Sequence, residues 1–164
     1  GKGTSFTVQL PLEAIELEAR TVETPIGAIQ PSSQQFDILL VEDNAVNQKV
    51  AVRMIEGFGH RVSVVEDGVA ALQALQNRSY DLVFMDCMMP VMDGLEATRR
   101  IRFEEKRTGD HQPIVAMTAN ALSGDEALCL EAGMDSYLAK PFQRTEVNLA
   151  IEKWARRLPR SQAA

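Results

Sequence analysis

Five short apolar runs alternate along the chain with longer stretches of helical periodicity, and this alternation limits the possible folds more than any other feature. Short runs that are apolar throughout are typical of parallel strands covered by helices on both faces. One α/β domain with five parallel strands is therefore expected between residues 36 and 157. The five runs are Ile38 to Val41, Val62 to Val65, Leu82 to Met85, Ile114 to Met117 and the shorter Tyr137 to Ala139.

The segments outside this region have a different character. In residues 1–12, Phe6, Val8 and Leu10 alternate with polar residues, which predicts one amphipathic strand. A single strand leaves its edges unpaired, so this one either pairs elsewhere or belongs to a larger domain. Residues 13–35 are first acidic and then rich in Pro, Ser and Gln, which is typical of a linker. Residues 158–164 form a short tail.

Composition excludes several classes of protein. The formal net charge of −6 argues against nucleic-acid binding, which depends on clustered Lys and Arg. No apolar run approaches the ~20 residues of a membrane span, and the N-terminus lacks the layout of a secretion signal. We therefore expect a cytoplasmic fragment that makes no direct contact with a membrane.

Neither the cysteines nor the histidines form a recognisable pattern. Cys87 and Cys129 lack CxxC spacing and have no nearby set of His ligands, so neither a zinc site nor a disulfide framework is expected. Both are interpreted as buried thiols. His60 and His111 are interpreted as ordinary surface or turn residues.

Carboxylates follow two of the predicted strands directly. Glu42 and Asp43 come after the first strand and Asp86 after the third. Open α/β sheets bind ligands at the carboxyl ends of their strands. Three acids at close range repel one another unless a cation or a proton relieves them. An all-oxygen ligand set suits Mg²⁺, which completes its shell with water and substrate phosphate. These acids therefore predict a magnesium site that handles phosphate.

Two more polar residues close strands at the same edge. Thr118 ends the fourth strand and Lys140 the fifth. A hydroxyl and an ammonium facing a metal-bound Asp86 would supply the neutralisation that phosphoryl transfer requires, with Asp86 as nucleophile. Alone, each of these residues is more commonly a cap, a turn former or a solvated charge. Five of them at the ends of four strands favour a site.

Four stretches of sequence resemble the receiver domains of response regulators in two-component signalling. This resemblance covers roughly residues 36 to 157 and implies a flavodoxin-like (βα)5 fold, a doubly wound five-stranded sheet with order 2-1-3-4-5. The stretches are ILLVEDNAVNQKV from Ile38, DLVFMDCMMPVMDG from Asp81, VAMTANAL from Val115 and GMDSYLAKPF from Gly133.

The resemblance assigns a metal pocket. Glu42, Asp43 and Asp86 would bind Mg²⁺, and the backbone carbonyl of Met88 would be a further ligand. Asp86 would be the phosphoacceptor. Because the Met88 side chain is neither an acid nor a base, we expect slow loss of the phosphoryl group to water.

The resemblance also assigns residues around the phosphoryl group. Thr118 would donate a hydrogen bond to the phosphoryl oxygens and Lys140 would pair with them. Tyr137 would move inward with Thr118 as the switch. Ala119 would leave access to the acyl phosphate, and Pro141 would follow a cis peptide bond that aims Lys140.

Residues 1–12 resemble the last strand of the ATP-binding domain of histidine kinases, although a cloning remnant is the alternative. The parent would then be a hybrid sensor kinase with the receiver fused behind its catalytic core, and such a kinase could be anchored in the inner membrane. A His-phosphotransfer domain or the parent kinase core would be the partner. By resemblance, partners dock on the first helix, where Ala45, Val46 and Lys49 are expected to be exposed.

Two other functions compete with a receiver. A Mg²⁺-dependent phosphohydrolase with an Asp nucleophile, of the haloacid dehalogenase type, needs a second Asp two residues after the first, where this chain has Met88. A flavodoxin-like binding module would use a phosphate loop rich in hydroxyl groups in place of crowded acids. A receiver would catalyse only its own phosphorylation and dephosphorylation.

Overall fold

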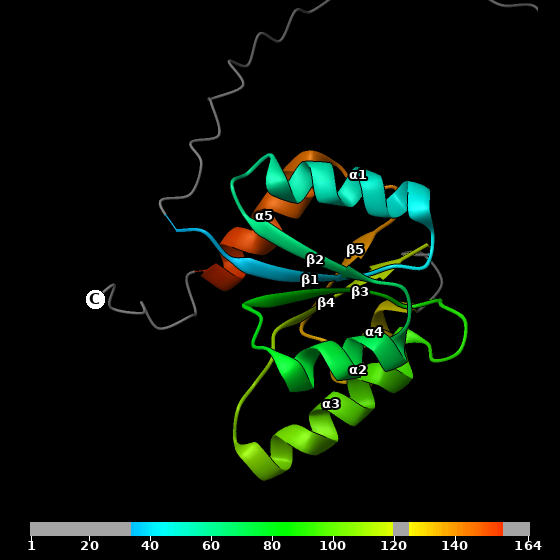
Figure 1. The fold of residues 1–164 in the computed structure, drawn as a ribbon. Coiled ribbons are helices and arrows are strands. Elements are labelled where there is room, and N and C mark those ends of the chain that lie inside the picture. The colour runs from blue at the N-terminus through cyan, green and yellow to red at the C-terminus, as the bar shows by residue number, and fades with distance from the viewer. Residues whose placement is uncertain (1–33, 120–124, 156–164) are drawn as a thin grey trace, which may run out of the picture. The chain divides into compact units, whose positions relative to one another are not determined.

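The computed structural model describes residues 34–119 and 125–155, which form a five-stranded parallel sheet (Figure 1). The strand order is β2-β1-β3-β4-β5, so the expected fold class and order are confirmed. Each strand is one residue longer than the apolar run that predicted it. The strands are β1 Asp37–Val41, β2 Arg61–Val65, β3 Leu82–Asp86, β4 Ile114–Thr118 and β5 Ser136–Ala139.

The predicted strand at residues 1–12, most of the predicted linker at 13–35 and the tail at 158–164 lie outside the described residues. Within the part of the chain that the structure describes, no helix has both the length and the apolar character that crossing a membrane requires.

Helices cover both faces of the sheet (Figure 1). Helices α1 (Ala45–Glu56) and α5 (Arg144–Ala155) lie on one face. Helices α2 (Gly68–Asn77), α3 (Gly94–Thr108) and α4 (Asp125–Glu131) lie on the other.

The core is divided by the sheet into two apolar layers. Successive residues of a strand point to opposite faces, so Ile38 and Leu40 of β1 pack in one layer, and Leu39 and Val41 in the other. All four are fully buried. The central strands are therefore apolar on both sides, as the sequence pattern predicted.

Strand β2 departs from that pattern because it lies at the edge of the sheet. The side chains of Arg61 and Val64 are exposed. The Arg61 Nε lies 2.8 Å from the Asp37 Oδ1 on β1. A charged residue on an edge strand discourages pairing with a second sheet. The expectation that every strand would be buried on both faces was wrong for β2, and β5, the other edge strand, is also only half-buried along its length.

Side-chain hydrogen bonds cap the N-termini of three helices. Asn44 caps α1, and Asp67 and Asp93 cap α2 and α3, each accepting hydrogen bonds from backbone N–H groups of the first turn. Helix α3 opens with Gly94, and a Cβ atom there would lie 2.1 Å from the carbonyl oxygen of Asp86. Only glycine lets the helix begin this close to the end of β3.

His60 is buried, which the sequence did not predict. Its side chain is 4% exposed and its Nδ1 lies 3.4 Å from the Phe36 backbone N, which donates to it. Burial lowers the pKa of His60. The neutral imidazole therefore satisfies the backbone at the start of the domain. His111 is at the surface, as expected, and its Nε2 lies 2.7 Å from the Asp135 Oδ1.

Candidate phosphorylation site and metal centre

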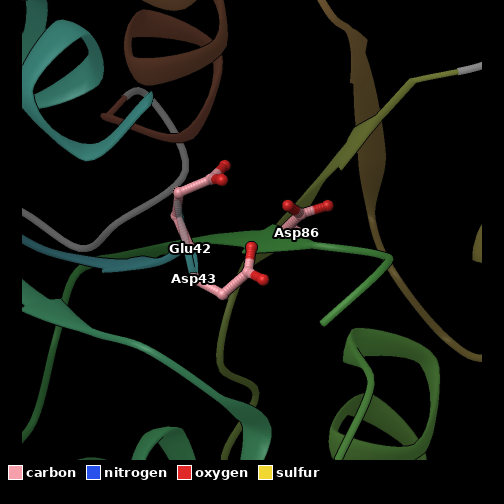
Figure 2. Close-up of side chains that lie close together, drawn as sticks. All are labelled: Glu42, Asp43 and Asp86. Carbon is pink, nitrogen blue, oxygen red and sulfur yellow. The ribbon is translucent and has the colours of Figure 1, made fainter. Parts of the chain in front are cut away.

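The register of the sheet brings three acids together. Val41 of β1 pairs with Met85 of β3, so the residues that follow them, Glu42 and Asp86, leave neighbouring strands side by side. One carboxylate oxygen each from Glu42, Asp43 and Asp86 lie within 4.8 Å of one another (Figure 2). Among the described residues, this is the one group of three potential metal ligands arranged in this way.

The three carboxylates differ in exposure. Glu42 and Asp86 are buried, whereas Asp43 is exposed to solvent. Burial raises the pKa of Asp86, and the charge of Glu42 raises it further. Hydrogen bonds from Lys140 and from the backbone N–H of Met88 work in the opposite direction. Asp86 is therefore an acid whose ionised form depends on positive charge nearby.

Lys140 supplies that charge. Its Nζ lies 2.6 Å from the Glu42 Oε2 and 2.5 Å from the Asp86 Oδ2, so it bridges acids from two strands. Burial works against the ammonium, but the hydrogen bonds to Asp86 and Glu42 outweigh it and raise the pKa of Lys140. The Lys140 backbone N donates to the Thr118 carbonyl at 2.7 Å, which ties the residue to the end of β4. The Lys140–Pro141 peptide bond is cis, as expected.

Three residues at the start of α1 hold Glu42, and sequence reasoning missed their role. The Asn47 Nδ2 and the Asn44 backbone N donate to the Glu42 Oε1 at 2.9 Å and 3.3 Å. The Gln48 Nε2 donates to the Glu42 backbone carbonyl at 2.7 Å. The available signal was their position, because polar amides in the first turn of the helix after an acid can reach back to it.

Thr118 lies next to the phosphoacceptor candidate on the neighbouring strand. Asp86 pairs in register with Met117, and Thr118 is the following residue and is buried. Ala119, the next residue, is exposed.

The remaining predicted residues lie on either side of this group. The Met88 backbone N donates to the Asp86 Oδ1 at 3.1 Å, while the Met88 side chain is exposed. Tyr137 is half-buried on β5, and its hydrogen bond with Glu126 of α4 raises the pKa of Tyr137. Tyr137 is thus linked to α4, away from the carboxylates.

The donor set fits a hard divalent cation. The three grouped ligands offer only carboxylate oxygens, and Asp43 faces solvent from which waters can complete a coordination shell. Mg²⁺ binds in this way, through one or two carboxylates with several retained waters. Glu42, Asp43 and Asp86 are therefore the residues that could hold Mg²⁺.

Comparison with known proteins gives the class to which this site belongs. Residues 38–152 match the response regulator receiver domain, and the chain belongs to that family. It is similar to the receiver domain of a sensor histidine kinase from Pseudomonas aeruginosa PAO1, whose crystal structure has a magnesium ion coordinated in the active-site cleft. That match has 49% identity and a TM-score of 0.68, and covers 74% of this chain and 98% of that chain.

Similar full-length proteins are histidine kinases. The sensor histidine kinase GacS of Pseudomonas protegens is 40% identical over 124 residues, which are 75% of this chain and 14% of that protein. Hybrid signal transduction histidine kinase K of Dictyostelium discoideum is 38% identical over 157 residues, which are 92% of this chain and 13% of that protein. The chain thus spans about one seventh of the length of these relatives, and it corresponds to the receiver region of hybrid kinases.

A solved complex shows a receiver with a partner. A co-crystal structure from Saccharomyces cerevisiae contains a histidine phosphotransfer signaling protein and the receiver domain of its downstream response regulator. This chain matches that structure with 27% identity and a TM-score of 0.72, covering 78% of this chain and 94% of that chain.

We predict that Mg²⁺ stabilises the protein through the three acids. A ligand at about one hundred times its Kd stabilises the folded state by ~2.7 kcal/mol, so Mg²⁺ should raise the thermal unfolding midpoint. Asp43→Asn should weaken Mg²⁺ binding at least about tenfold, a loss of ~1.4 kcal/mol. Calorimetric titration measures the affinity directly. Asp110→Asn, at an exposed acid outside the site, is the control. Equal Mg²⁺ affinity in both variants would contradict this assignment.

Proposed function

We propose that this receiver takes a phosphoryl group from a phosphohistidine onto Asp86 in a phosphorelay, with Mg²⁺, as part of a hybrid sensor histidine kinase that acts on the cytoplasmic side of the membrane. The observation that supports this most is the bridging of two buried strand-end acids by Lys140. The family match favours this function over a phosphohydrolase, and Met88 stands where such an enzyme would need its second acid.

The reaction is a displacement at phosphorus. A carboxylate oxygen of Asp86 attacks, the phosphorus–nitrogen bond to the donor imidazole breaks, and the histidine leaves as a neutral base or takes up a proton. Mg²⁺, when bound, neutralises charge on the transferring oxygens. The Met88 N–H fixes one Asp86 oxygen, and Lys140 contacts the other, so the attacking group is oriented before the donor arrives.

Phosphorylation changes the charge around two neighbours. Lys140, which now binds both Glu42 and Asp86, would turn to the added phosphoryl oxygens, and Thr118 would donate its hydroxyl to them. Movement of Thr118 toward Asp86 would free space that Tyr137 can enter. Such a shift biases an equilibrium between two states, and α4, which bears the hydrogen-bond partner of Tyr137, would report it.

Helix α1 offers a surface for the phosphodonor beside the site. Ala45, Val46 and Lys49 are all exposed, as the sequence analysis expected. A cleft of about 410 Å³, lined in part by Asn47 and Val50 of the same helix, reaches Lys140. We propose that a His-phosphotransfer domain or the parent kinase core docks here, with an apolar patch around its histidine. The cleft is lined by Asn47, Val50, Lys140, Pro141 and Phe142.

Asp86→Asn should abolish phosphorylation because the amide is a poor nucleophile. Incubation with acetyl phosphate and Mg²⁺, followed by intact-mass measurement, should show a gain of one phosphoryl group in the wild type and none in the variant. Asp110→Asn should keep the gain. A mass gain that survives the Asp86 substitution would show that the acceptor is a different residue.

The phosphorylated form should persist for minutes or longer, because the exposed Met88 side chain cannot position water for attack on the acyl phosphate. Met88→Asn introduces an amide that can hydrogen-bond such a water and should shorten the half-life about tenfold. Met88→Leu should leave it unchanged. Decay of the phosphoprotein on a phosphate-affinity gel gives these half-lives, and a wild-type half-life of a few seconds would contradict the prediction.

Val46→Asp should slow phosphoryl transfer from a phosphorylated His-phosphotransfer protein at least about tenfold, since it places a charge in an apolar contact. The Val46 side chain is 69% exposed, and an acid near a helix N-terminus keeps the helix stable. Phosphorylation by acetyl phosphate should be unaffected. Phe103→Asp, at an exposed apolar position on α3, is the matched control. Equal transfer rates in the two variants would place the docking surface elsewhere.

A further inference from the structure

Two thiols meet beside the phosphorylation site. Cys87 follows Asp86 at the end of β3, and Cys129 lies on α4, 42 residues away in the sequence. Their Sγ atoms are 3.3 Å apart. Cys87 is 6% exposed and Cys129 1% exposed, and both belong to the apolar layer beneath α2, α3 and α4. The phosphoryl chemistry proposed above uses neither thiol.

The two sulfurs are in non-bonded contact, 3.3 Å apart. A disulfide has a sulfur–sulfur length of ~2.05 Å, so an approach of about 1.2 Å closes the gap. The two thiols lie on different elements of the fold, and these are the only two cysteines in the chain. An intramolecular disulfide in this protein therefore has one possible connectivity.

The backbone of each cysteine is hydrogen-bonded within a different part of the fold. The Cys87 backbone N donates to the Met117 carbonyl at 3.0 Å, and its carbonyl accepts from the Gly94 N at 3.3 Å. The Cys129 carbonyl accepts from the Met134 N at 3.0 Å, at the end of α4. A bond between the sulfurs would fasten α4 to the residue that follows the phosphoacceptor.

We propose that Cys87 and Cys129 form a reversible disulfide that links α4 to the phosphorylation site and slows phosphorylation of Asp86. The oxidant is a peroxide, which is small enough to reach a buried sulfur. Cys87, the more exposed thiol, is oxidised to a sulfenic acid as the peroxide O–O bond breaks and one water forms. The Cys129 sulfur then displaces the hydroxyl group, which leaves as a second water. The two thiols lose two electrons and two protons, and the peroxide is reduced to two waters.

The expected effect on phosphorylation rests on the proposed function of Asp86. Drawing Cys87 toward α4 moves the backbone on which Asp86 and Met88 are carried. In a pre-organised site, a misplacement of about 1 Å reduces a rate by up to ~100-fold. The bond would also hold α4 at a fixed distance from the site and oppose the rearrangement that follows phosphorylation. In reducing compartments, disulfides are usually transient and redox-sensing, which fits this role.

The test treats the purified protein with hydrogen peroxide and then divides it into samples with and without dithiothreitol. Peptide mapping should find Cys87 joined to Cys129, with an intact mass lower by about 2 Da. The phosphorylation rate with acetyl phosphate and Mg²⁺ should fall about tenfold and recover in dithiothreitol. Reduced thiols after this treatment, or an unchanged rate in the disulfide form, would overturn the proposal.

Two single variants separate this effect from other oxidation. Cys129→Ala and Cys87→Ala each remove one sulfur, and peroxide should not slow phosphorylation reversibly in either. Methionine sulfoxide adds mass and is not reversed by dithiothreitol, so it is distinguishable. A reversible loss of rate in either variant would also overturn the proposal, because it would show that a single oxidised thiol is sufficient. If reduced wild type were not phosphorylated at all, the function of Asp86 would fail while the disulfide readout remained interpretable.

Discussion

Repulsion among the acids at the carboxyl edge of the sheet, and its relief by Lys140, is the interaction on which the site depends. Glu42 and Asp86 are buried side by side, and burial of a like-charged pair costs free energy unless a cation lies between them. The Lys140 ammonium, which directly follows the edge strand β5, contacts both of them. With one ammonium and three carboxylates, the pocket keeps a net negative charge, which favours binding of a divalent cation. Lys140 thus offsets part of the repulsion between the buried acids, and the remaining negative charge fits the proposed magnesium site.

The topology of the sheet makes this crowding unavoidable. The chain places β3 beside β1 and β2 on the other side of β1, so the strand order reverses at the point where Glu42 and Asp86 emerge. Gly94 then allows α3 to begin against the Asp86 carbonyl, which fixes the loop that carries Met88. In a sheet of this kind, the positions of the strand ends determine which reactive groups lie close together, and the loops that follow the strands complete the site.

The sequence predicted the strands and the shared edge of the acids, because both follow from local periodicity or from the position of a residue relative to a strand. It placed Lys140 at the edge that faces Asp86, but it did not predict that the ammonium bridges Asp86 and Glu42, because that contact depends on the positions of individual side chains. Nor did it predict that His60 is buried. A polar residue next to a glycine usually lies at the surface, and only tertiary packing against Phe36 shows otherwise.

The contact between the two thiols was also not predicted from the sequence. It lies on the opposite face of the sheet from the acids. Asp86 points to the side of Lys140 and Glu42, whereas its neighbour Cys87 packs in the opposite apolar layer with Cys129. Adjacent residues of a strand point to opposite faces, so the end of β3 carries the candidate phosphoacceptor on one face and Cys87, in contact with Cys129 of α4, on the other. Under the functions proposed above, a shift of the backbone at the end of β3 would therefore act on both Asp86 and α4.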